Sequence, residues 1–187
     1  MSNIHLFDMK HSRSKPTLRE SFLVADTAHE GQVRKYTGDP YIVHPLAVAK
    51  IVQSVTQDID MLCAAMLHDT VEDTTMTNSA IQKIFGVRTA NFVNELTDIC
   101  VPEDGNRALR KSIERRRLNQ VSAQAQTIKL ADLIDNSKSI LDADAKFAST
   151  YMSEMEELLG VLTRGSHTLH WEATMILKGY RDAKPTA

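Results

Sequence analysis

An apolar stretch of the chain runs directly into four ionisable side chains. Residues 62–67 are all apolar, and the pairs His68-Asp69 and Glu72-Asp73 follow at once. In an α-helix, residues three and four positions apart share a face, so Asp69 would lie beside both later acids and His68 beside Glu72. Burying such acids without a partner is costly. The stretch therefore indicates a bound cation, with further ligands brought from elsewhere in the chain.

The fold expected around this stretch is all-α. Val48, Ile51, Val52 and Val55 recur at the spacing of an amphipathic helix, and no segment alternates apolar and polar residues as a strand would. Turn residues separate the segments. Helices are predicted over about 17–31, 44–55, 59–72, 77–86, 87–100, 106–118, 122–141, 143–163 and 167–181. We expect a helical bundle of roughly eight or nine helices.

Length and composition fit a single domain. The chain has 187 residues, of which 42% are hydrophobic and 25% charged, as in ordinary globular proteins. This length is sufficient for one core. Residues 1–15 are polar and basic without a period, so we expect a flexible N-terminal arm there and a domain over 16–183. The apolar face of the last two helices is more typical of a core than of an interface.

Charge and cysteine usage narrow the expected partners and location. A formal net charge of −2 argues against a polybasic nucleic-acid-binding protein. Cys63 and Cys100 are isolated, which suggests a reducing compartment. There is neither a signal-peptide pattern nor an apolar run near the roughly 20 residues that span a membrane. We expect a cytoplasmic protein without nucleic-acid or membrane partners, and the oligomeric state, monomer or homodimer, stays open.

Two further residues could complete a metal site with His68 and Asp69. His44 precedes Pro45 at a helix start, where it could point inward, although an ordinary helix-start histidine is the better reading of His44 alone. Asp132 interrupts an apolar helical run, or simply faces solvent between core positions. The set His44, His68, Asp69 and Asp132 offers two imidazoles and two carboxylates. Such a mixed site suits Mn²⁺ better than a structural zinc ion, for which cysteines are more usual.

Glu72 and Asp73 then remain without a ligand role. Either could orient or deprotonate an attacking water molecule as a general base. Alternatively, they form an acidic pair at the surface, or Asp73 holds a basic partner such as Lys129 or Arg34. The spacing leaves these alternatives open.

An anionic substrate would need positive charge nearby. Arg34 and Lys35 precede His44 in a loop, and six basic residues, among them Lys111, lie in the run 106–117. Arginine suits bidentate phosphate contacts and can stack on a base. Most of the run is expected to be a solvated helix face. Asn136 lies one turn beyond Asp132 and could contact a sugar hydroxyl or a phosphate.

Four ordered motifs resemble the hydrolase domain of the RelA/SpoT family, within the HD phosphohydrolase superfamily. They are Ala-His-Glu-Gly-Gln-Val-Arg-Lys, Gly-Asp-Pro-Tyr-Ile-Val-His-Pro, Leu-His-Asp-Thr-Val-Glu-Asp-Thr, and Lys-Leu-Ala-Asp followed by Asn, at 28–35, 38–45, 67–74 and 129–136. The resemblance covers roughly residues 17 to 140. A lone His-Asp would be weak evidence, but the ordered set is specific.

The resemblance implies a function as well as a fold. The chain has no room for synthetase and regulatory domains and looks like the stand-alone small alarmone hydrolases of the Mesh1 type. That implies one Mn²⁺ ion and removal of the 3′-pyrophosphate from (p)ppGpp-like nucleotides, giving GDP or GTP and pyrophosphate. By resemblance, the four residues named above match the metal ligands and Glu72 and Asp73 the catalytic acids. Arg34 matches an arginine that packs on the base, and Asn136 a nucleotide contact.

Two departures from the family pattern concern the base. Tyr36 stands where a small Ser or Thr is common, and Asp135 where His or Tyr is common. They add bulk and negative charge near the nucleotide that Arg34, Lys35, Tyr36, Lys111, Lys129 and Asn136 are expected to contact. Adenosine alarmones, (p)ppApp, are therefore an alternative substrate. NADPH or another nucleotide ranks lower, as does a non-catalytic nucleotide-binding module, which would be expected to lose such costly acids.

Overall fold

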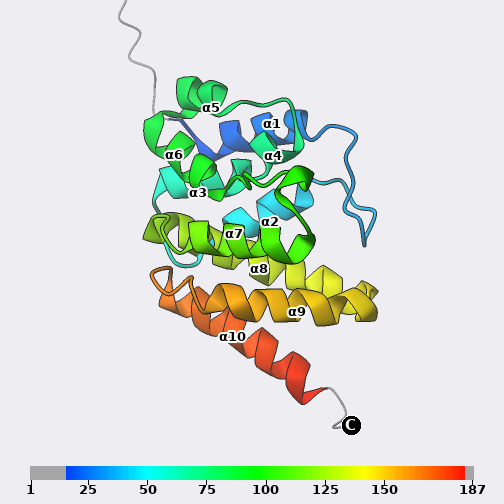
Figure 1. Cartoon of the computed structure of the whole chain (residues 1–187). Coiled ribbons are helices and arrows are strands. Elements are labelled where there is room, and N and C mark those ends of the chain that lie inside the picture. The colour runs from blue at the N-terminus through cyan, green and yellow to red at the C-terminus, as the bar shows by residue number, and fades with distance from the viewer. Residues whose placement is uncertain (1–15, 184–187) are drawn as a thin grey trace, which may run out of the picture.

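The all-α prediction is confirmed in a computed structural model that describes residues 16–183 (Figure 1). The predicted arm over residues 1–15 lies outside the described residues. Within them, the β-type pairing is a single bridge between Val33 and Pro40, and no helix has the length and apolar character to cross a bilayer. The helices are α1 Leu18–Ala28, α2 Val43–Gln53, α3 Ile59–Leu67, α4 Thr70–Asp73, α5 Asn78–Phe85, α6 Val87–Leu96, the 3₁₀ turn η1 Pro102–Asp104, α7 Arg107–Leu118, α8 Ala123–Ala143, α9 Ala145–Leu159 and α10 His167–Asp182.

Helix α3 lies at the centre of the N-terminal helices. Residues 61–67 are all buried, and α1, α2, α6 and α8 pack around them. A helix that is apolar on every side must be covered on every side, which accounts for the lack of a polar face before His68. The end of this buried helix brings His68 into the interior of the protein.

Helix α8 lies between the N-terminal helices and the pair α9 and α10 (Figure 1). It is the longest helix, with 21 residues, and it packs against α2 on one side and against α9 and α10 on the other. Asp132 lies in its middle and is buried. The two acids of greatest interest, Asp69 and Asp132, therefore approach one another from separate helical layers.

The continuous helix predicted over 59–72 is wrong, because it is interrupted at His68 and Asp69. Helix α3 ends at Leu67 and α4 begins at Thr70. The His68 Nδ1 donates to the Ala65 carbonyl at 2.8 Å and the Thr70 hydroxyl to the Leu67 carbonyl at 2.7 Å. Side chains thus take up carbonyls that a further helical turn would have used. His68 consequently faces the interior from the end of one helix, while the later acids belong to another.

Two other predicted helices end earlier than expected. The helix predicted over 87–100 stops at Leu96, where the Thr97 hydroxyl bonds back to the Val93 carbonyl. The helix predicted over 143–163 spans Ala145–Leu159: the Asp144 side chain caps its start by accepting from the Phe147 amide, and Gly160 is the residue that follows its end. These boundaries depend on side-chain caps that hydrophobic spacing does not report.

The segment between α1 and α2 folds into a tight turn. The Arg34 amide donates to the Asp39 carbonyl at 2.8 Å, and the Gly38 amide donates to the Arg34 carbonyl at 2.9 Å. Gly38 has a φ of 76°, a left-handed conformation that glycine adopts at little cost. The turn projects from the helical body (Figure 1) and fixes the backbone of Arg34 before the chain enters α2.

Gly165 is a position where the packing leaves no room for a side chain. A Cβ there would lie 2.8 Å from the Leu130 side chain and 3.1 Å from backbone atoms of Gln126 and Thr127. We expect Gly165→Ala to lower the free energy of unfolding by about 1–3 kcal/mol, as overpacking usually does. Chemical denaturation measures this loss.

Gly179 provides the matched control for that substitution. It lies in α10, and a Cβ there would meet nothing within 4 Å. Gly179→Ala should raise the free energy of unfolding by about 0.5–1 kcal/mol through helix propensity. Equal effects of the two substitutions would contradict this account of the contact between α8 and Gly165.

Candidate metal and nucleotide site

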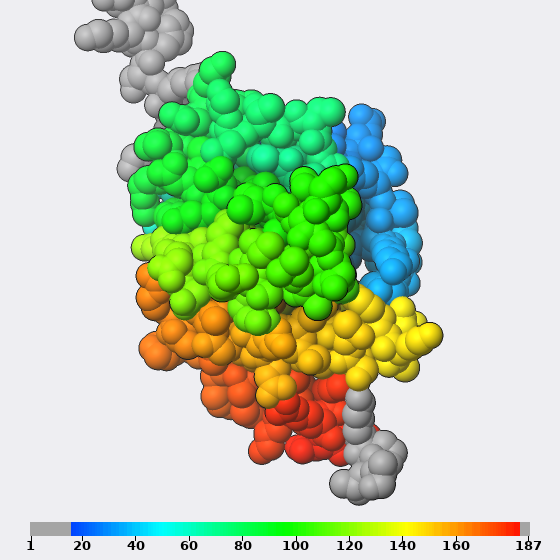
Figure 2. Space-filling model, viewed as in Figure 1, coloured from blue at the N-terminus to red at the C-terminus, as the bar shows by residue number. Residues whose placement is uncertain are grey.

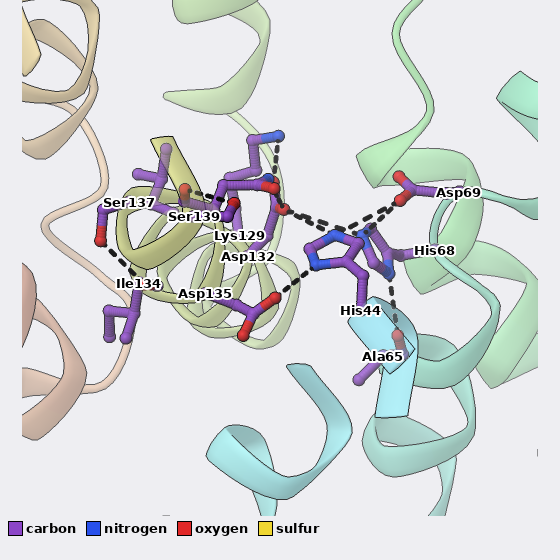
Figure 3. Close-up of polar contacts among 12 residues, drawn as sticks. His44, Ala65, His68, Asp69, Lys129, Asp132, Ile134, Asp135, Ser137 and Ser139 are labelled. Atoms are coloured by element: carbon purple, nitrogen blue, oxygen red, sulfur yellow. Dashed lines mark hydrogen bonds and ion pairs between the residues drawn. The ribbon is translucent and has the colours of Figure 1, made fainter. Parts of the chain in front are cut away.

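The four predicted metal ligands lie together in the structure. His44 comes from α2, His68 and Asp69 from the break between α3 and α4, and Asp132 from α8 (Figure 3). The His44 Nε2 lies 3.2 Å from Asp132 Oδ1 and 3.5 Å from Asp69 Oδ2. The His68 Nε2 lies 3.0 Å from Asp69 Oδ2 and 3.9 Å from Asp132 Oδ1. Two nitrogen and two oxygen atoms thus converge from three parts of the chain.

Both imidazoles are held by the nitrogen that faces away from this cluster. The His68 Nδ1 donates to the Ala65 carbonyl, and the His44 Nδ1 donates to Asp135 Oδ2 at 2.7 Å. Each Nε2 therefore points toward the carboxylates, where it can bind a cation that displaces its proton. The His68 Nε2 is buried and, although it lies 3.0 Å from Asp69 Oδ2, it forms no well-directed hydrogen bond with any of the described residues. A buried imidazole nitrogen beside two carboxylates is a donor set that suits a divalent cation.

The carboxylates around the two imidazoles favour a positive charge at this position, either on the rings or on a bound cation. Burial alone lowers the pKa of His44, but its hydrogen bonds to Asp132 and Asp135 outweigh burial and raise that pKa to about 9. Burial likewise disfavours the charged form of Asp132, yet the Lys129 ammonium and the His44 hydrogen bond hold the pKa of that carboxyl well below its usual range. The negative charge of these carboxylates can be balanced by protons on the imidazoles or by a metal ion that displaces those protons.

Glu72 and Asp73 are exposed to solvent and line the same cavity as the cluster. The Glu72 Oε2 accepts from the Asp98 amide at 3.0 Å. Although solvent reaches both side chains, the surrounding protein partly desolvates their carboxylates, and this desolvation together with the nearby Asp69 charge raises the pKa values of both acids. The alternative in which Asp73 holds Lys129 or Arg34 is not seen, since Lys129 Nζ donates to Asp132 and Arg34 donates to residues of α8.

Tyr41 belongs to the site, although the sequence analysis did not single it out. Its hydroxyl donates to Asp69 Oδ2 at 2.6 Å and lies 3.3 Å from Asp73 Oδ2. Burial and the Asp69 charge raise the pKa of Tyr41 far above its ordinary value, so the hydroxyl keeps its proton. Tyr41 thus connects a candidate ligand to a candidate catalytic acid. Its position three residues before His44 was the available signal, but the direction of a loop side chain cannot be read from spacing.

A cavity of about 350 Å³ opens beside the cluster. Three predicted substrate contacts line it, namely Lys111, Lys129 and Asn136. The walls also include basic and aromatic side chains that the sequence analysis did not name individually, Arg107, Arg115, Phe147 and Tyr151. The cavity therefore combines the acid cluster with positive charge and apolar ring surface.

Arg34, Lys35 and Tyr36 do not line the cavity but lie near its edge. The Arg34 guanidinium donates to Asn136 Oδ1 and to Ser139 Oγ, each at 3.1 Å. The Lys35 Nζ lies 5.0 Å from the centre of the Tyr36 ring and 5.8 Å from that of Phe147. This segment, α7 and the start of α9 adjoin on the face shown in Figure 2.

Two arginines of the basic run of α7 form ion pairs with acids of α9. Arg107 pairs with Glu154 at 2.7 Å, and Arg115 pairs with Glu157. Lys111 lies between them along the helix and forms no ion pair with any acid of residues 16–183, which leaves its ammonium available to an anion. Arg116, in contrast, is exposed, as most of the run was expected to be.

Metal binding by the cluster should be visible in protein stability. Mn²⁺ at about one hundred times its Kd should add about 2.7 kcal/mol to the wild type and raise its Tm, and EDTA should reverse the effect. His68→Ala should abolish the Mn²⁺-dependent shift. His167→Ala, at an exposed position that starts α10, is the matched control and should keep the whole shift. A full shift in His68→Ala would show that this cluster is not the site.

Metal affinity should also depend on pH in a defined direction. Because the pKa of His44 is raised to about 9 without a metal, the imidazole is protonated below that pH and the proton competes with the cation. The apparent Mn²⁺ affinity should therefore rise as pH increases from 6 toward 9. Calorimetric titration in buffers of different ionisation enthalpy would measure both the affinity and the released protons. A constant affinity without proton release would contradict this.

The family-model comparison identifies an HD domain over residues 21–158. The chain is 33% identical over 162 residues to a probable GTP pyrophosphokinase of Mycobacterium leprae, covering 83% of this chain and 20% of that protein. It is 36% identical over 126 residues to a guanosine-3′,5′-bis(diphosphate) 3′-pyrophosphohydrolase of Vibrio cholerae, covering 66% and 18%. The chain thus spans about a fifth of the length of these curated relatives.

A solved structure is similar over nearly the whole chain. It is described as a metazoan ortholog of SpoT that hydrolyses ppGpp, and it matches with a TM-score of 0.79 and 26% identity, covering 89% of this chain and 98% of that one. These likenesses confirm the resemblance seen in the four ordered motifs. The HD-domain model matches well over half of the chain, and the chain therefore belongs to the HD domain family.

Proposed function

We propose that this chain is a metal-dependent nucleotide hydrolase that removes the 3′-pyrophosphate from (p)ppGpp-like alarmones, with Mn²⁺ as its metal. The observation that carries the proposal is a cavity lined by the His-Asp cluster, by two further acids and by Lys111, so that one nucleotide bound there could contact all of them. The ppGpp hydrolase activity described for the metazoan structural relative supports the choice of substrate.

The cation would be held by His44, His68, Asp69 and Asp132, whose imidazole and carboxylate donors suit manganese. When bound there, it would supply Lewis-acid polarisation of a phosphoryl oxygen. Asp135 and the Ala65 carbonyl orient the two imidazoles through their Nδ1 atoms. The Tyr41 hydroxyl restrains Asp69 Oδ2. The chain's own hydrogen bonds thus fix the donors before any substrate arrives.

Positive side chains would bind and orient the diphosphate. Lys111 and Lys129 line the cavity, and Lys129 is anchored by its contact with Asp132 Oδ2 at 2.7 Å. Asn136, also at the cavity wall, is placed to contact the sugar. Arg34, held against α8, together with the exposed Lys35 and the half-buried Tyr36, would meet the base and the outer phosphates.

Glu72 and Asp73 would handle the protons of the reaction. Water attacks the phosphorus attached to the ribose 3′ oxygen, and the bond between that phosphorus and the 3′ oxygen breaks. One acid takes the proton from water, and a proton is returned to the 3′ oxygen, so that the products are the nucleotide 3′-hydroxyl and pyrophosphate. Their raised pKa values bring the two carboxylates closer to the range in which proton transfer is efficient.

The proposal predicts pyrophosphate release from alarmones by the purified protein with Mn²⁺. Glu72→Gln should lower kcat by about 10²–10⁴-fold, the usual contribution of a general base, with an unchanged circular dichroism spectrum. Glu103→Gln is the matched control, because Glu103 lies exposed in η1 away from the cavity lining, and it should retain full activity.

A side-by-side comparison of ppGpp, pppGpp, ppApp and pppApp tests the substrate. Faster cleavage of the guanosine pair would support the proposal, and faster cleavage of the adenosine pair would move the assignment to (p)ppApp. If all four stayed intact with Mn²⁺ present, the proposed reaction would be wrong.

A further inference from the structure

One carboxylate oxygen contacts both a candidate metal ligand and the predicted base-contacting arginine. The Asp135 Oδ2 accepts from the His44 Nδ1 at 2.7 Å and lies 3.6 Å from the Arg34 Nη2. The three side chains are only 14%, 1% and 13% exposed, respectively. The contacts are therefore poorly screened by solvent. Figure 3 shows Asp135 directed at His44 from α8.

Arg34 is held by three residues of α8 and not by Asp135 alone. Its Nη1 donates to Asn136 Oδ1, and its Nη2 donates to Ser139 Oγ. The Asn136 Nδ2 in turn donates to Asp132 Oδ1 at 2.6 Å. Arg34 is thus connected to two candidate ligands, to His44 through Asp135 and to Asp132 through Asn136.

The chemistry of these contacts gives Asp135 two effects. A carboxylate on the outer nitrogen of a ligating histidine fixes the ring and makes the inner nitrogen a better donor. A guanidinium is planar, so contacts at both of its terminal nitrogens fix the plane that it presents to a ligand. Histidine or tyrosine at position 135 could not place a charged oxygen against both groups.

We propose that Asp135 is a positioning residue that couples the metal site to nucleotide binding through Arg34. Metal binding at His44 and nucleotide binding at Arg34 then share one restraint, so each strengthens the other. The nucleotide part of this inference rests on the proposed function, whereas the metal part does not.

The first test measures Mn²⁺ binding without any nucleotide, by calorimetric titration of the full chain. Asp135→Asn should weaken Mn²⁺ binding by about tenfold to a hundredfold, as loss of such a supporting carboxylate typically does. Asp142→Asn is the matched control, because Asp142 is an exposed acid on the same helix, and it should bind Mn²⁺ like the wild type. Circular dichroism would check that both variants are folded.

The second test measures GDP binding at saturating Mn²⁺. Asp135→Asn should weaken GDP binding severalfold even when the metal site is full, because Arg34 has lost its charged restraint. Ser139→Ala removes a contact to Arg34 without touching His44. It should weaken GDP binding while leaving Mn²⁺ affinity unchanged, which a general loss of structure could not do.

The outcomes separate the two parts. Wild-type Mn²⁺ affinity in Asp135→Asn would overturn the proposal. Weak Mn²⁺ binding together with wild-type GDP affinity at saturating metal would overturn the coupling and leave Asp135 as a support for His44 only. Failure of the wild type to bind GDP would instead count against the proposed function and, with it, the nucleotide part.

Discussion

Negative charge buried at the junction of α3, α4 and α8 is the constraint on which the rest of the site depends. Asp132 is almost fully buried, and Asp69 lies 3.0 Å from the Nε2 of the equally buried His68. Charges in such a position are tolerated only with partners. The partners present are the two imidazoles, the Lys129 ammonium and the Tyr41 hydroxyl. A divalent cation would complete this balance.

Much of this arrangement could be predicted from the sequence, and the failures have physical causes. Helical spacing was enough for most elements, since each helix buries one regular face. His68 and Asp69 could be recognised because they follow an apolar run. The break in the helix at these residues could not be predicted, because it depends on side chains that donate to the Ala65 and Leu67 carbonyls.

The sequence also could not predict the contacts of residues in loops or of residues around the metal ligands. Asp135 was expected to add negative charge near the nucleotide, but its carboxylate is engaged by His44 and Arg34. Tyr41 went unnoticed because a side chain in an irregular segment has no period that gives its direction. Likewise, the pairing of Arg107 with Glu154 depends on how α7 packs on α9, whereas Lys111, on the same helix, has no such acid partner among residues 16–183. Contacts between elements distant in sequence are set by tertiary packing alone.

The spacing of four polar side chains along α8 limits the sequence changes that the protein can tolerate. Asp135, Asn136 and Ser139 lie three, four and seven positions after Asp132, so all four lie on a single face of a rigid helix. Inserting or deleting one residue earlier in α8 would rotate this face by about 100° and misplace all four groups together. Length variation among natural homologues should therefore be confined to the segments on either side of α8, while substitutions within it can occur one position at a time.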